Sequence, residues 1–102
     1  MDRVAMLKEI LAENPNDAFA RYGLAMEYAN TGDPTTALVE YEKIVELNPE
    51  YVPAYQMAGQ LVMNLGRDTD ARSWFERGIA AARRAGNQHA ESEMQGMLDL
   101  LP

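Results

Sequence analysis

The chain of 102 residues has no cysteine, one histidine, and only nine basic residues against sixteen acidic ones. Without cysteine there is no thiol nucleophile, no thiolate zinc site and no redox switch. The net charge of −7 argues against nucleic acid and anionic membrane surfaces as partners. The chain is nevertheless 47% apolar, which is too hydrophobic for disorder, so one small compact domain is expected.

Long apolar stretches are also missing. Residues 1–14 carry charged side chains where a signal peptide needs an unbroken apolar core, so we expect a helix of the fold there. The longest uncharged run, from Tyr51 to Gly66, contains a proline and three side-chain amides, which makes it too short and too polar to span a bilayer. We expect a soluble, cytoplasmic protein that does not bind membranes.

Residues that carry catalysis occur singly or at unsuitable spacing. His89 has no second histidine or cysteine with which to share a metal, so it is interpreted as a polar residue at the start of the last helix. Glu40 and Glu42 are two positions apart, which on a helix points them away from each other, and they are expected to be solvated charges. No glycine-rich phosphate loop follows a strand. The sequence therefore predicts no enzyme, no metal and no cofactor.

What the sequence does contain is an internal repeat with a period of 34 residues. Residues 10–15 fall on residues 44–49, and one column of large side chains joins Leu7, Tyr41 and Phe75. This many matches in one register are typical of repeat architectures, in which each unit completes its core with its neighbour. Further matched pairs are Ala20/Ala54, Ala25/Gly59, Asn30/Asn64, Gly32/Gly66, Ala37/Ala71 and Val45/Ile79.

Each period predicts a helix, a tight turn and a second helix. In residues 17–30, Ala20 and Leu24 begin an apolar stripe at helical spacing. Gly32 can adopt the left-handed conformation that ends this helix, and Asp33 can cap the next one. No segment alternates as a strand does, so the expected fold class is all-α. Helices are expected at 2–14, 17–30, 34–47, 52–64, 68–85 and 88–100.

The period and several of its residues resemble the tetratricopeptide repeat (TPR). The resemblance implies antiparallel helix-turn-helix repeats, stacked as a short right-handed solenoid of about six helices within a single domain. That domain would span 1–102, with a half-repeat at 2–14, full repeats at 17–50 and 51–85, and a capping helix at 88–101. The residues that carry the resemblance are Leu24, Ala25, Tyr28, Gly32, Ala37, Tyr41 and Asn48-Pro49, then Tyr55, Gly59, Gly66, Ala71 and Phe75. One departure is Arg21, which occupies a position usually held by a large aromatic residue; Phe19 and Tyr22 are candidate substitutes.

The resemblance also implies a site, because in TPR folds the first helices of successive repeats line a concave groove that binds peptides or a partner's helix. The matching residues here share an uncharged face of Met, Tyr and amide side chains, which suits an adaptable contact. The alternative for each single residue is that it completes the core, since stripes at helical spacing are commonly core. The expected partner-binding residues are Phe19, Tyr22, Met26, Asn30, Gln56, Gln60, Met63 and Asn64.

The function that follows is a non-enzymatic adaptor or scaffold that binds a protein or peptide in this groove. The alternative is a self-assembling module, either a homodimer or a domain-swapped dimer. The half-repeat at the N-terminus would leave Met6 and Ile10 partly exposed, and Trp74 occupies the place that Glu40 holds one repeat earlier. Helix 88–100 could instead cover Trp74, which would remove that residue from any interface.

Overall fold

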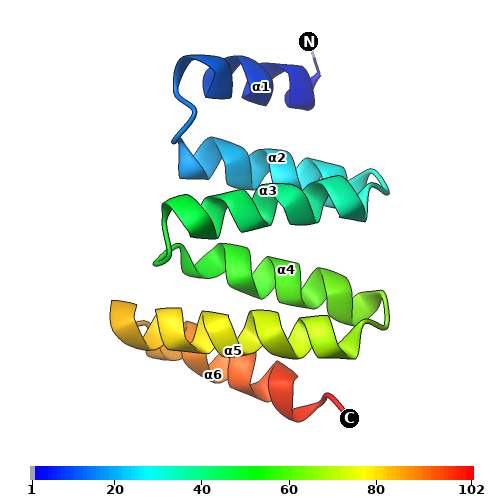
Figure 1. The fold of residues 1–102 in the computed structure, drawn as a ribbon, viewed down its shortest axis with the longest axis vertical. Helices are drawn as coiled ribbons and strands as arrows, with labels where there is room; N and C mark the ends of the chain where they lie inside the picture. The colour runs from blue at the N-terminus through cyan, green and yellow to red at the C-terminus, as the bar shows by residue number, and fades with distance from the viewer. Residues whose placement is uncertain (1) are drawn as a thin grey trace. The chain divides into compact units, whose positions relative to one another are not determined.

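The computed structural model describes residues 2–102 and contains, within that range, six α-helices and no strand (Figure 1). Every helix expected from the 34-residue pattern is present, and the ends differ from the expected ones by two residues or fewer. The all-α prediction is therefore confirmed. The helices are α1 (Arg3–Glu13), α2 (Ala18–Asn30), α3 (Pro34–Leu47), α4 (Val52–Asn64), α5 (Asp68–Ala85) and α6 (Gln88–Asp99).

The chain forms two compact units that meet in sequence at the Asn48-Pro49 dipeptide. In the first unit α1 packs on α2 and α2 packs on α3; in the second, α4 packs on α5 and α5 packs on α6. Proline disfavours helical backbone at the residue before it, so α3 ends at Leu47 and the chain is free to begin a new hairpin.

Short polar side chains fix where the helices begin. The carboxylate of Asp33 accepts a hydrogen bond from the backbone N–H of Thr36 at 3.2 Å, and Asp2, Asp17 and Asn87 cap their helices in the same way. Such caps satisfy N–H groups that the first turn of a helix leaves without a partner. Gly32 adopts a φ of 85° in the turn before α3, a conformation in which other residues are strained. Both turn predictions, at Gly32 and Asp33, are confirmed.

The core of the first unit begins between α1 and α2. Leu7 and Leu11 from α1 pack with Ala20 and Leu24 from α2, and Tyr28 lies against this cluster. Farther along, the side chains of α3 that face inward are fully covered; the largest are Tyr41 and Ile44. One face of α1, with Leu7 and Leu11, is thus buried against α2.

The second unit depends on a very close approach of α4 to α5. A Cβ atom built on Gly59 would lie 2.5 Å from the buried ring of Phe75, so only glycine fits there. Gly78 plays the same part between α5 and its neighbours, because a Cβ there would lie 2.5 Å from the sulfur of Met94 in α6. Gly59, which the 34-residue shift pairs with Ala25, thus lies where α4 and α5 approach closely.

Candidate functional site

Four of the predicted partner-binding residues lie along α2. Phe19 is 79% exposed, which is unusual for so large an apolar side chain, and Asn30 is also exposed. Tyr22 and Met26 are half-buried. Their spacing of three, four and four residues places all four on one side of the helix. The two ends of this α2 face, at Phe19 and Asn30, are therefore exposed, and its middle, at Tyr22 and Met26, is half-buried.

Tyr22 is a member of the α2 face that also packs against a core residue of α3. Its ring centroid lies 6.2 Å from that of Tyr41 in α3, with the ring planes at 60°. Burial raises the pKa of the Tyr41 hydroxyl, and the neighbouring Tyr22 raises it further. A change at Tyr22 would therefore disturb the packing of α2 on α3 as well as any partner, and Phe19 is the cleaner probe of this face.

The other four predicted residues lie along α4. Gln56, Gln60 and Met63 are half-buried and Asn64 is exposed. No residue of α4 carries a charge. The amide nitrogen of Gln60 lies 3.5 Å from the sulfur of Met97, so α6 borders this face. Because a thioether sulfur is a weak acceptor, this contact is a weak hydrogen bond for the Gln60 amide.

Met97 is a residue of this face that sequence reasoning missed. Its spacing from Met94 and Leu101 assigns it to the buried stripe of α6, and periodicity alone cannot tell the centre of such a stripe from its edge. In the structure Met94 is fully buried, whereas Met97 is half-exposed beside Gln60. The eight predicted residues thus fall four to each unit, and Met97 joins the set on α4.

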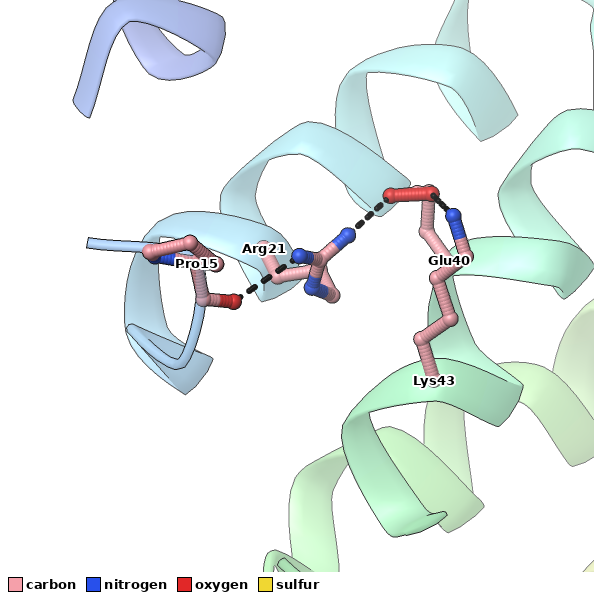
Figure 2. Close-up of polar contacts among 4 residues, drawn as sticks. All are labelled: Pro15, Arg21, Glu40 and Lys43. Carbon is pink, nitrogen blue, oxygen red and sulfur yellow. Dashed lines mark hydrogen bonds and ion pairs between the residues drawn. The ribbon is translucent and has the colours of Figure 1, made fainter. Parts of the chain in front are cut away.

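Arg21 does not leave the aromatic position of the first repeat empty. Its guanidinium donates to a carboxylate oxygen of Glu40 in α3 at 2.8 Å and to the carbonyl oxygen of Pro15 at 2.9 Å (Figure 2). Phe19 is exposed, so it is not the substitute that the sequence suggested. Arg21 itself spans the space between the two helices.

The expectation that Glu40 is a solvated charge is wrong. It is buried rather than solvated, with 7% of its surface exposed, and its second carboxylate oxygen lies 3.6 Å from the ammonium of Lys43. Sequence alone placed it beside Glu42 and missed Arg21, which lies 19 residues away on the facing helix. The group is a structural ion pair that joins α2 to α3.

Trp74 is likewise covered. It is 7% exposed, its ring centroid lies 6.2 Å from that of Tyr55 in α4, and the guanidinium of Arg77 lies 4.5 Å above it. A surface for self-assembly centred on Trp74 is therefore wrong. Met6 and Ile10, by contrast, are 46% and 41% exposed, as expected for α1.

The single histidine, the acidic side chains and the helix lengths are the features that bear on metal binding and membrane insertion. His89 is strongly exposed and lies 2.8 Å from the carboxylate of Glu93 on the next turn of α6. Across residues 2–102, no group of three or more histidine, aspartate and glutamate side chains could hold a metal ion. None of the helices described has both the length and the apolar composition that crossing a membrane requires.

Comparison with known proteins gives consistent likenesses. A family model described as a tetratricopeptide repeat matches residues 28–90. A TPR repeat-containing protein of Pseudomonas aeruginosa is 32% identical over 88 residues, which is 86% of this chain and 84% of that protein. The solution structure of a TPR domain protein from Salinibacter ruber is 38% identical with a TM-score of 0.77, covering 83% of this chain and 86% of the other. A Bordetella parapertussis protein, at 26% identity, has a TM-score of 0.81 and covers 97% of this chain and 86% of its own. Each likeness spans more than one repeat.

Proposed function

The chain belongs to the tetratricopeptide repeat family, and from this premise we propose that it is an adaptor or scaffold that binds a segment of a partner protein through the uncharged faces of α2 and α4. TPR domains are generally protein–protein interaction modules, and proteins of the family are generally non-enzymatic scaffolds. The residues that form these two faces support their assignment as the binding surfaces.

The observation that carries the proposal is the chemistry of α4. A helix face kept only for solubility normally carries charge, yet Gln56, Gln60, Met63 and Asn64 lie on a helix with none. Methionine adapts its shape to different apolar surfaces, and half-buried amides can bond a backbone that lies over them. This combination supports contact with a polypeptide and offers nothing for a strongly charged ligand.

The amides of α4 also have a spacing that suits an extended ligand. Gln56, Gln60 and Asn64 recur every four residues, which is about 6 Å along a helix. Alternate residues of an extended chain recur at about 6.6–6.8 Å, so successive amides can reach successive backbone groups on one edge of such a chain. We therefore favour an extended segment that lies along α4, with an apolar side chain that contacts Met63.

Several arginines elsewhere in the chain pair with carboxylates of the same chain. Arg3 pairs with Glu27, Arg84 with Glu50 and Arg83 with Glu91, at 2.9, 2.7 and 2.6 Å. With an overall charge of −7, the protein would repel an acidic segment at long range. The segment that fits best is accordingly neutral or mildly basic.

The experiment is a selection of short peptides from a random displayed library on the immobilised chain, followed by affinity measurement on variants. We expect Met63→Glu to weaken peptides that bind along α4, and Phe19→Glu to weaken peptides that bind along α2, each at least about tenfold, which is about 1.4 kcal/mol. Val39→Glu is the matched control, because Val39 is 50% exposed on α3, outside both faces. Peptides that bind all three variants equally, or a selection without enrichment, would overturn the proposal.

A further inference from the structure

A different surface lies on α1, at the end of the first unit beyond α2 (Figure 1). While Leu7 and Leu11 are buried against α2, Met6 and Ile10 lie on an adjacent face of α1 and keep 46% and 41% of their surface exposed. Two exposed charges, Arg3 and Glu13, flank them one turn away at either end. We call Arg3, Met6, Ile10 and Glu13 the α1 seam.

The repeat register shows what kind of surface the α1 seam is. A shift of 34 residues places Met6 on Glu40 and then on Trp74, both of which are buried. Glu40 contacts Arg21 of α2, and Trp74 contacts Tyr55 of α4, so this position faces the preceding helix of each hairpin.

Ile10 aligns in the same way with Ile44 and Gly78, which are also buried. Met6 and Ile10 thus occupy helix-contact positions, yet both keep more than two fifths of their surface exposed.

The spacing of the α1 seam suits a second helix. Its four residues are separated by three, four and three positions, the pattern of the a and d positions that pair two helices in a coiled coil. This spacing reads the same in both directions. An antiparallel copy of α1 would therefore set Met6 against Ile10 of the second copy, and Arg3 against its Glu13.

We propose that the α1 seam binds the α1 seam of a second copy of this chain, which gives a two-fold symmetric, antiparallel dimer. The occupant is argued from self-complementarity: apolar residues meet apolar residues at the centre, and opposite charges meet at both ends. A foreign helix would have to supply this same sequence of groups, whereas every copy of the chain already carries it.

Two features set the strength of the dimer. Arg3 already pairs with Glu27 at 2.9 Å, but its side chain is 58% exposed and a guanidinium has five N–H donors, so a second carboxylate can bind it. Helices of 11 residues are only about 16 Å long and bury little area, as in weak and transient complexes. We expect a dissociation constant above about 1 µM.

The experiment measures molar mass by sedimentation equilibrium from about 10 µM to about 1 mM. The wild-type mass should rise from that of one chain toward that of two. Ile10→Asp should weaken association at least about tenfold. Val39→Asp is the control, because it places the same charge on an exposed aliphatic position of α3 in the same unit. Circular dichroism would verify that both variants remain helical, as exposed positions allow.

Charge exchange tests the antiparallel register itself. Arg3→Glu alone sets two acids together, and Glu13→Arg alone sets two cations together, so each variant should associate less than wild type. An equimolar mixture of the two should associate again, because every end of the mixed dimer then pairs a glutamate with an arginine. A monomer at all concentrations would overturn the proposal and leave the α1 seam to a helix of another protein. A dimer unaffected by Ile10→Asp, or a mixture that stays monomeric, would overturn it as well.

Discussion

Arg21 and Tyr55 stand 34 residues apart and make the same hydrogen bond with different chemistry. Each donates from the end of its side chain to the carbonyl oxygen of the proline six residues earlier, Arg21 to Pro15 at 2.9 Å and Tyr55 to Pro49 at 2.8 Å. Each also contacts the same position of the following helix, which is Glu40 in the first hairpin and Trp74 in the second. The two hairpins thus share one geometry and differ in whether an ion pair or an aromatic pair provides it.

The ion pair gives the first prediction. Glu40→Leu leaves the guanidinium of Arg21, whose side chain is only 13% exposed, without its carboxylate, and we expect a loss of about 3 kcal/mol in the free energy of unfolding. Arg21→Met combined with Glu40→Leu removes both charges and should cost much less than the single change. Urea unfolding of the two variants and wild type measures both values; equal losses would contradict the ion-pair interpretation.

Two glycines form a matched pair for the second prediction. Gly59→Ala places a methyl group 2.5 Å from the Phe75 ring, so we expect destabilisation of about 2 kcal/mol despite the better helix propensity of alanine. Gly96→Ala, on α6, meets no atom within 4 Å and should stabilise the protein by about 0.5–1 kcal/mol. Thermal and urea unfolding of the two variants should therefore shift in opposite directions, and a shift in the same direction would be inconsistent with the packing described.

The third prediction concerns pH. Burial raises the pKa of the Tyr41 hydroxyl above its ordinary value of 10.0. Above about pH 10 the unfolded chain therefore releases a proton that the folded chain retains, so the free energy of unfolding falls as pH rises, by about 1.4 kcal/mol per pH unit at most. Tyr41→Phe removes this contribution. We expect urea midpoints measured between pH 9 and about pH 11 to fall less steeply for the variant; parallel slopes would exclude Tyr41 as the cause.

The fourth prediction separates two phenylalanines. Phe75 is fully buried between α4 and α5, and Phe75→Ala should cost about 3–5 kcal/mol. Phe19 is 79% exposed, and Phe19→Ala should change the free energy of unfolding by less than about 0.5 kcal/mol while it weakens peptide binding. Unfolding and peptide-binding assays on the same two variants check both halves. A large stability loss at Phe19 would mean that it supports the fold.

The helices and turns could be predicted from sequence because their signals are local. Gly32, Asp33 and the Asn48-Pro49 dipeptide act within a few residues of where they stand, and the 34-residue period repeats each signal. Gly59 was also foreseeable, since a small residue recurs at a fixed place in each hairpin. Local chemistry and repetition therefore determine the secondary structure here.

The polar interior could not be predicted in the same way. Whether Glu40 is solvated or buried depends on Arg21, which only the register of two antiparallel helices brings to it. Likewise, the amide of Gln60 meets Met97 37 residues away in sequence. Helical spacing identifies the face on which a side chain lies, but the identity of the facing group is a property of the hairpin. The use of the α2 and α4 faces in binding stays a prediction.

The unlike pairs in the two hairpins have a consequence during folding. A chain with two similar hairpins can join the first helix of one to the second helix of the other, a characteristic failure of repeat proteins. Joining α4 to α3 would bury Glu40 beside Tyr55 without the guanidinium of Arg21, and joining α2 to α5 would set that guanidinium against Trp74 with no carboxylate from the facing helix. Both errors lose the buried counter-charge, so they are penalised relative to the correct hairpins. If Arg21→Tyr and Glu40→Trp together make the hairpins alike, refolding should yield more mispaired and exchanged species than wild type does.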